Sequence, residues 1–225
     1  MEFVMSSVLY SFPKCAEFGR VLPKSKIYEH ASPTSKIKEL FVQEVEKIIW
    51  SYKLSPETIN LPVKGFIKEI QIFTIALKTG DLKHAVLQVI DKAIPSPILY
   101  QLIFENKIRY VAACKRQNEA DKSKWVVSSY FETNWMPNNT KRVALPVVLD
   151  LGALYHTMLR NIIPLPARQN ETLDELVSQV ERLSIKEREA AFIAARLKKE
   201  KQFNRKVEIN AELRNIKQEI EELNR

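Results

Sequence analysis

The chain has 225 residues, of which 45% are hydrophobic and 28% charged, and its formal net charge is +8 at pH 7. This composition supplies a core and excludes a wholly disordered chain, while the lack of eighteen consecutive apolar residues excludes a transmembrane helix. Two cysteines are too few for a disulfide framework, and four scattered glycines exclude a glycine-rich phosphate loop. Because the N-terminal stretch lacks a basic segment followed by an apolar one, we expect a cytoplasmic protein without a secretory signal.

The first half of the chain alternates helical and extended patterns. Apolar residues recur at three- and four-residue steps over 35–53, which predicts an amphipathic helix that ends before Pro56. Residues 69–78 are apolar at nearly every position and rich in β-branched side chains, as is typical of a strand buried on both faces. Residues 82–92 place their apolar side chains on one stripe and predict a second helix.

The chain then predicts three strands and one more helix. The strands are expected at 98–104, 108–114 and 125–131. Asn106 suits a tight turn between the first two strands, and residues 145–163 have helical periodicity. Pro164 and Pro166 prevent that helix from continuing. This order of elements predicts an α+β domain over 1–168, with a small, mostly antiparallel sheet and packed helices.

Residues 169–225 are expected to form a long helical coiled-coil arm. Neither glycine nor proline occurs after Glu171, and apolar residues alternate at steps of three and four. This seam is the candidate surface for self-association or partner binding, and its main members are Leu176, Val180, Leu183, Leu197, Ile209, Leu213, Ile216, Ile220 and Leu223. The two halves of the seam are one residue out of step, with the break inside Lys198–Lys206. We expect a continuous or mildly bent helix there, because Asn204 is the strongest turn former, and a helical hairpin is the alternative.

Two local concentrations of basic residues are candidate nucleic-acid-binding surfaces. All of the excess positive charge lies in 1–170, whereas 171–225 is neutral as a whole. The first set comprises Lys107, Arg109, Lys115, Arg116, Lys122 and Lys124, and the second comprises Lys198, Lys199, Lys201, Arg205 and Lys206. Such sets bind by neutralising phosphates. Because no recognition helix of a familiar type accompanies them, we expect any DNA affinity to be independent of sequence.

The sequence predicts no catalytic residue, no cofactor and no metal site. The three histidines stand far apart, and no cysteine pair has the spacing of zinc ligands. Asp91 followed by Glu105 and Lys107 matches the residue pattern of a magnesium-dependent nuclease site, an acidic residue and then Glu-x-Lys. A nuclease is therefore the alternative function. However, Glu105 and Lys107 flank the tip of an expected hairpin, where charges are normally solvated, whereas catalytic residues project from a supported strand.

Five segments together resemble an uncharacterised bacterial family, classed as a domain of unknown function. They are Phe18–Ala31, Glu46–Pro62, Val89–Leu102, Lys124–Trp135 and Glu200–Arg214. The similarity extends over essentially the whole chain. Members of that family look like small partners encoded beside helicases and DNA methyltransferases in restriction-type, anti-phage gene clusters. The resemblance therefore implies a helicase or methyltransferase as protein partner, and it brings no catalytic residue with it.

We therefore expect a non-enzymatic accessory subunit of a restriction-type or anti-phage defence assembly. It would bind a helicase or methyltransferase and, in addition, DNA. We expect no membrane contact. The alternatives are a metal-dependent DNA nuclease subunit and a coiled-coil oligomeric scaffold. Homo-oligomerisation through the arm stays open.

Overall fold

The computed structural model describes residues 8–118, 121, 125–165, 168 and 171–224, and the chain divides into two units, Met1–Pro164 and Leu165–Arg225. In the first unit the helices are η1 Lys14–Ala16, α1 Lys24–Ala31, α2 Ser35–Glu44, α3 Pro56–Ile59, α4 His84–Ala93 and α5 Leu151–Arg160. Its strands are β1 Tyr10–Ser11, β2 Glu17–Val21, β3 Val45–Leu54, β4 Ile70–Leu77, β5 Ile98–Phe104, β6 Lys107–Gln117, β7 Trp125–Glu132, β8 Met136–Pro137 and β9 Val143–Ala144.

The main sheet is mixed but mostly antiparallel. Within the described part of the chain it has seven strands in the order β2-β3-β4-β5-β6-β7, with β8 paired to β6. Only β4 and β5 in this path are parallel, because α4 carries the chain back across the sheet between them. A separate two-stranded sheet pairs β1 with β9 in parallel. The expected α+β class is confirmed, as are the strands at 69–78, 98–104, 108–114 and 125–131 and the helix at 82–92.

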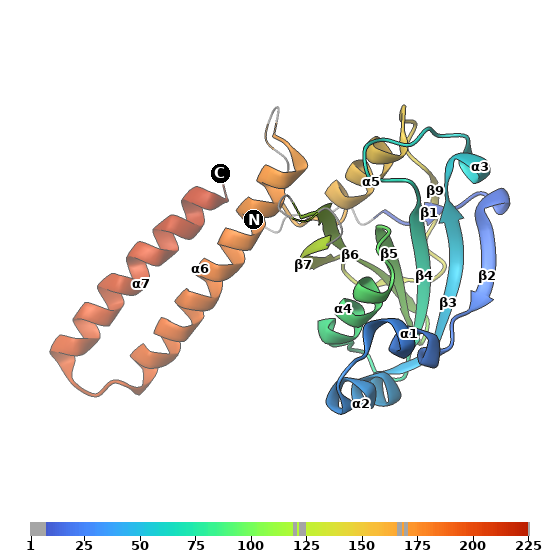
Figure 1. Cartoon of the computed structure of the whole chain (residues 1–225). Coiled ribbons are helices and arrows are strands. Elements are labelled where there is room, and N and C mark those ends of the chain that lie inside the picture. Colours follow the sequence, from blue (N-terminus) through green and yellow to red (C-terminus); the bar gives the residue numbers. More distant parts are fainter. Residues whose placement is uncertain (1–7, 119–120, 122–124, 166–167, 169–170, 225) are drawn as a thin grey trace. The chain divides into compact units, whose positions relative to one another are not determined.

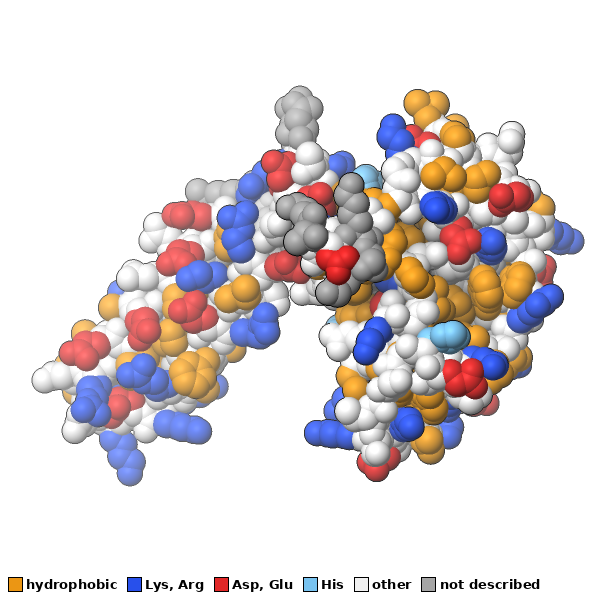
Figure 2. All heavy atoms as spheres, viewed as in Figure 1, with side chains coloured by type: hydrophobic (Ala, Val, Ile, Leu, Met, Phe, Trp, Pro, Cys, Tyr) orange, Lys and Arg blue, Asp and Glu red, His pale blue; other side chains and the backbone are white. Residues whose placement is uncertain are grey.

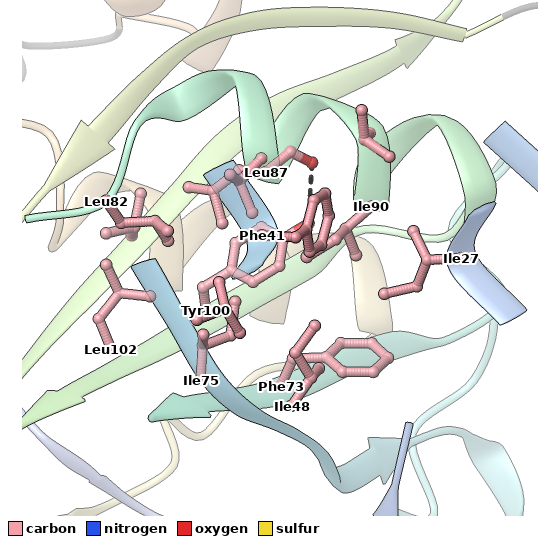
Figure 3. Close-up of a cluster of buried hydrophobic side chains, with 14 of the residues drawn as sticks. Ile27, Phe41, Ile48, Phe73, Ile75, Leu82, Leu87, Ile90, Tyr100 and Leu102 are labelled. Carbon is pink, nitrogen blue, oxygen red and sulfur yellow. Dashed lines mark hydrogen bonds between the residues drawn. The ribbon is translucent and has the colours of Figure 1, made fainter. Parts of the chain in front are cut away.

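One face of the sheet carries the main core. Helices α1, α2 and α4 cover this face (Figure 1). Side chains alternate along a strand, so Phe73 and Ile75 of β4 and Tyr100 of β5 point into the same cluster as Phe41 and Leu87 from the helices. Figure 3 shows these side chains converging, with the Tyr100 hydroxyl donating a 3.5 Å hydrogen bond to the carbonyl of Leu87.

The expected helix over 35–53 is wrong beyond Glu44. The chain leaves α2 at that point and continues as β3, which pairs antiparallel with both β2 and β4. Lys24 marks the end of the helix, because its ammonium donates to the carbonyls of Phe41 and Val45 at 2.7 and 2.6 Å. The pairing partners of β3 come from distant parts of the chain, so strand formation overrides the local helical periodicity.

The expected helix over 145–163 begins later, at Leu151. Asp150 is its N-cap, since the Oδ1 atom accepts a 2.8 Å hydrogen bond from the amide of Ala153. Residues 145–149 precede the cap without forming a helix, and Pro146 lies among them. Asp150 and Pro146 indicate in the sequence that the helix begins after them, but the apolar periodicity of residues 145–150 favoured an earlier start.

The second unit is a helical hairpin. Helix α6 spans Leu173–Lys199 and α7 spans Phe203–Leu223, and the two lie side by side (Figure 1). The expected continuous helix is therefore wrong, and the break in the apolar register marks the point of reversal. At the start of α6, Thr172 and Glu175 form a capping box in which each side chain accepts a hydrogen bond from the other residue's amide.

The apolar seam of the arm is buried where α6 and α7 pack against each other. Leu176, Val180, Leu183, Ile209, Leu213 and Ile216 are buried, and Leu197 and Ile220 are partly buried against the cluster around Ile193. Leu223 is half-buried at the end of α7. The seam is thus not the exposed association surface that a single extended helix would present.

Candidate functional site

Lys115, one of the candidate phosphate-binding residues, is buried in the first unit. Only 1% of its side chain is exposed, and its ammonium lies 2.7 Å from Oδ1 of Asp91. The same ammonium donates to the carbonyls of Ile94 at 2.7 Å and Ser96 at 2.9 Å. Ile94 is the C-cap of α4, and Ser96 lies in the connection from α4 to β5. The prediction is therefore wrong for Lys115, which holds the end of a helix and has no access to a phosphate.

The carboxylate of Asp91 is shared with an aromatic hydroxyl. Tyr130 of β7 donates a hydrogen bond to Oδ2 of Asp91, opposite the oxygen that pairs with Lys115. Burial and then the negative charge of Asp91 raise the pKa of the Tyr130 hydroxyl far above its ordinary value. Burial lowers the pKa of the Lys115 ammonium, and Asp91 opposes that change. This satisfied network ties α4 to β6 and β7.

Asp91 lies far from the other two residues of the nuclease alternative, Glu105 and Lys107. Asp91 contacts Lys115, whereas Glu105 and Lys107 are exposed at the turn between β5 and β6. Eight residues of extended strand separate Lys107 from Lys115, a span of roughly 27 Å. Across the described residues, no three His, Cys, Asp or Glu side chains form a group suited to a metal ion. Asp91 and Glu105 are therefore not ligands of one magnesium ion.

The other basic residues of the first set that the structure describes, Lys107, Arg109 and Arg116, do not form one patch. Arg109 is largely buried, with its guanidinium 4.7 Å from the ring centre of Trp135 and 2.7 Å from a carboxylate oxygen of Glu132. Lys107 and Arg116 are exposed near opposite ends of β6. Arg116 also interacts with another group of the protein. Lys122 and Lys124 lie outside the described residues. The described members of this set are thus scattered and do not form a continuous phosphate-binding surface.

The second basic set occupies the tip of the helical hairpin, which we define as residues 196–206. All of its basic side chains are exposed: Arg196, Lys198, Lys199, Lys201, Arg205 and Lys206. Figure 2 shows Lys and Arg side chains gathered at the end of the hairpin where α6 passes into α7. Glu200 is the only acidic residue in this window, which leaves a formal charge of +5.

The single acid of the tip is engaged by the backbone. Oε1 of Glu200 accepts hydrogen bonds from the amides of Lys201 at 2.7 Å and Gln202 at 2.9 Å. These bonds lower the pKa of the Glu200 carboxyl. Glu200 thus holds the connection that precedes α7, and the lysines around it are exposed.

Two exposed phenylalanines on the arm were missed by sequence reasoning. Phe203, the first residue of α7, is 77% exposed, and Phe192 on α6 is 70% exposed. For Phe203 the sequence does contain a signal, because this aromatic residue lies inside a run of basic residues and outside the apolar seam. Because Phe203 is absent from the hairpin's core cluster, packing does not explain it.

An apolar groove is the second surface that the sequence did not predict. It is a cavity of about 830 Å³ in the first unit, and its lining includes Phe12, Pro13 and residues 144–148. Val147 and Leu149 beside it are almost fully exposed. The thiol of Cys15, also in the lining, donates to the carbonyl of Thr58 at 2.9 Å. Contiguous apolar exposure of this kind marks interaction surfaces.

Comparison with known proteins gives one match. No curated protein and no solved structure is similar to the chain. Within the described ranges, no helix is long and apolar enough to cross a lipid bilayer. A family model described as a domain of unknown function, DUF4391, matches residues 11–220 and so covers both units. The chain therefore belongs to the DUF4391 family.

Proposed function

We propose that this protein is a non-enzymatic accessory subunit of a restriction-type or anti-phage defence assembly, which contacts nucleic acid through the hairpin tip and docks a helicase or methyltransferase through its body. The observation that carries the nucleic-acid contact is the group of six exposed basic side chains around the turn from α6 to α7. Glu200 is the only acid among them and accepts hydrogen bonds from backbone amides, and Arg196 lies 4.0 Å from a carboxylate oxygen of Glu212, so the lysines carry most of the excess charge. A polyanion is the ligand that complements such a surface.

The tip is expected to bind phosphates by releasing their counterions. Each phosphate contact steepens the dependence of log K on log salt concentration by about 0.9 for duplex DNA and about 0.7 for a single strand. We therefore expect replacement of four tip lysines by glutamine to weaken binding at least about tenfold and to make the salt slope shallower by about 3 to 4. The changed residues are Lys198, Lys199, Lys201 and Lys206. Fluorescence anisotropy with a labelled oligonucleotide, over a range of salt concentrations, measures both quantities.

A variant with the same loss of charge on the first unit is the control. It replaces four exposed lysines of that unit by glutamine: Lys14, Lys36, Lys68 and Lys92. We expect this variant to keep the wild-type salt slope to within about one contact. Equal losses in the two variants would mean that overall charge, and not the tip, attracts nucleic acid, and an unchanged tip variant would refute the contact.

The apolar groove supports the docking of a protein partner. Val147 and Leu149 expose their side chains almost completely, so their replacement by aspartate should cost the fold little. We expect the double variant to lose co-purification with the helicase or methyltransferase after co-expression. Val42→Asp, at another exposed apolar position on α2, is the matched control and should retain the partner. Retention by the double variant would remove the groove from the proposal.

A further inference from the structure

Starting from the proposed nucleic-acid contact, we infer that the hairpin tip binds single-stranded nucleic acid, with the ring of Phe203 stacked on a base. Phe203 stands between Lys201 and Arg205 in the chain and is 77% exposed. One turn further along α7, Val207 is also exposed, so the two apolar side chains share one face of the helix. Phosphate binding alone does not require the exposed apolar side chains of Phe203 and Val207.

The hairpin itself does not require Phe203. Its core is formed by Ile193, Ile209, Leu213 and Ile216, with Ala190, Ala194, Leu197 and Ile220 packed around them. The connection before α7 is held without Phe203, because the carboxylate of Glu200 accepts hydrogen bonds from the amides of Lys201 and Gln202. Exposure of a phenylalanine ring to water is unfavourable, so its position among cations indicates a ligand with both apolar faces and negative charge.

Single strands have both of these features. In a duplex, the faces of the bases are covered by their stacked neighbours, and an exposed phenylalanine finds only phosphates and sugars. In a single strand the bases are free to stack on an aromatic ring, and the flanking phosphates remain available to Lys201, Arg205 and Lys206. Stacking is tolerant of base identity because every base has a π-face, which agrees with the absence of a recognisable base-reading helix.

The test compares Phe203→Ala with the wild-type full chain on three labelled ligands: oligo-dT, oligo-rU and a DNA duplex of equal length. Loss of one stacked base should weaken binding of a single strand by about 5- to 150-fold. Duplex affinity should change less than about twofold, since all charges of the tip remain. Phe203→Trp should restore single-strand binding, and Phe192→Ala, which removes the other exposed ring of the arm, is the matched control.

The outcomes separate this inference from the proposed function. If the four-lysine variant of the tip loses binding while Phe203→Ala binds every ligand as the wild type does, the contact stands and stacking is refuted. A wild-type preference for the duplex, or equal losses on all three ligands, overturns the inference as well. If the four-lysine variant binds normally, the nucleic-acid contact itself fails. A difference between oligo-dT and oligo-rU identifies DNA or RNA as the favoured strand.

Discussion

Replacement of Lys115 by methionine is expected to lower the free energy of unfolding by about 3–5 kcal/mol, because the change leaves the Asp91 carboxylate buried without its counter-charge. The side chains of Lys115 and Asp91 are 1% and 3% exposed, so water does not replace the lost partner. The carbonyls of Ile94 and Ser96 lose their donor at the same time. Urea denaturation followed by far-ultraviolet circular dichroism measures the loss.

A double variant shows whether the buried charge is the cause. Asp91→Asn combined with Lys115→Met removes both charges and keeps an oxygen that accepts the hydrogen bond from Tyr130. We expect it to be more stable than Lys115→Met alone, with a coupling energy above about 1 kcal/mol. Simple addition of the two single effects, or a cost below about 1 kcal/mol for Lys115→Met, would contradict the ion-pair explanation.

Stability is expected to fall steeply above pH 10, because the fold holds tyrosine hydroxyls in their neutral form, above all those of Tyr100, Tyr110, Tyr130 and Tyr155. Burial raises the pKa of Tyr110 to about 12, and it raises the pKa values of Tyr100, Tyr130 and Tyr155 well above their ordinary value of 10.0. Above pH 10 the unfolded chain therefore binds fewer protons than the folded chain, so the free energy of unfolding decreases as pH rises. Each tyrosine contributes about 1.4 kcal/mol per pH unit.

The four tyrosines together remove about 5 kcal/mol per pH unit, which is comparable to the whole stability of a small domain. We expect alkaline unfolding within about two pH units of pH 10. The lowered pKa of Lys115 acts in the opposite direction only below its ordinary value of 10.5, because both states are deprotonated above it. Measurements between pH 10.5 and about 12 thus exclude the contribution of Lys115.

Tyr100→Phe provides the control for this pH dependence. The Tyr100 hydroxyl donates a long hydrogen bond to the carbonyl of Leu87 at 3.5 Å and lies near the Asp91 carboxylate, so its removal should cost about 1 kcal/mol at neutral pH. The variant should lose about a quarter of the alkaline slope. A free energy of unfolding that stays constant up to about pH 12 would show that the hydroxyls reach solvent.

The sequence alone was sufficient where one local pattern decides the structure. Strands β4, β5 and β6 are apolar over most of their length, and α4 has one clear apolar stripe, so burial determines each element without reference to a particular partner. The basic run that forms the hairpin tip was also identified from sequence, because its basic residues lie within eleven positions, although a continuous helix was expected there. Exposure of such a run follows from the cost of burying unpaired charge.

Only the tertiary structure decided β3, Lys115 and the apolar seam. Val45–Leu54 has helical periodicity but becomes a strand between β2 and β4, whose backbone groups come from elsewhere in the chain. Lys115 looks like its exposed neighbours until the fold places Asp91, 24 residues earlier, against its ammonium. The seam of the arm is covered by reversal of the chain at 200–202. In each case the partner is distant in sequence, and periodicity records which side chains share a face but not what that face will contact.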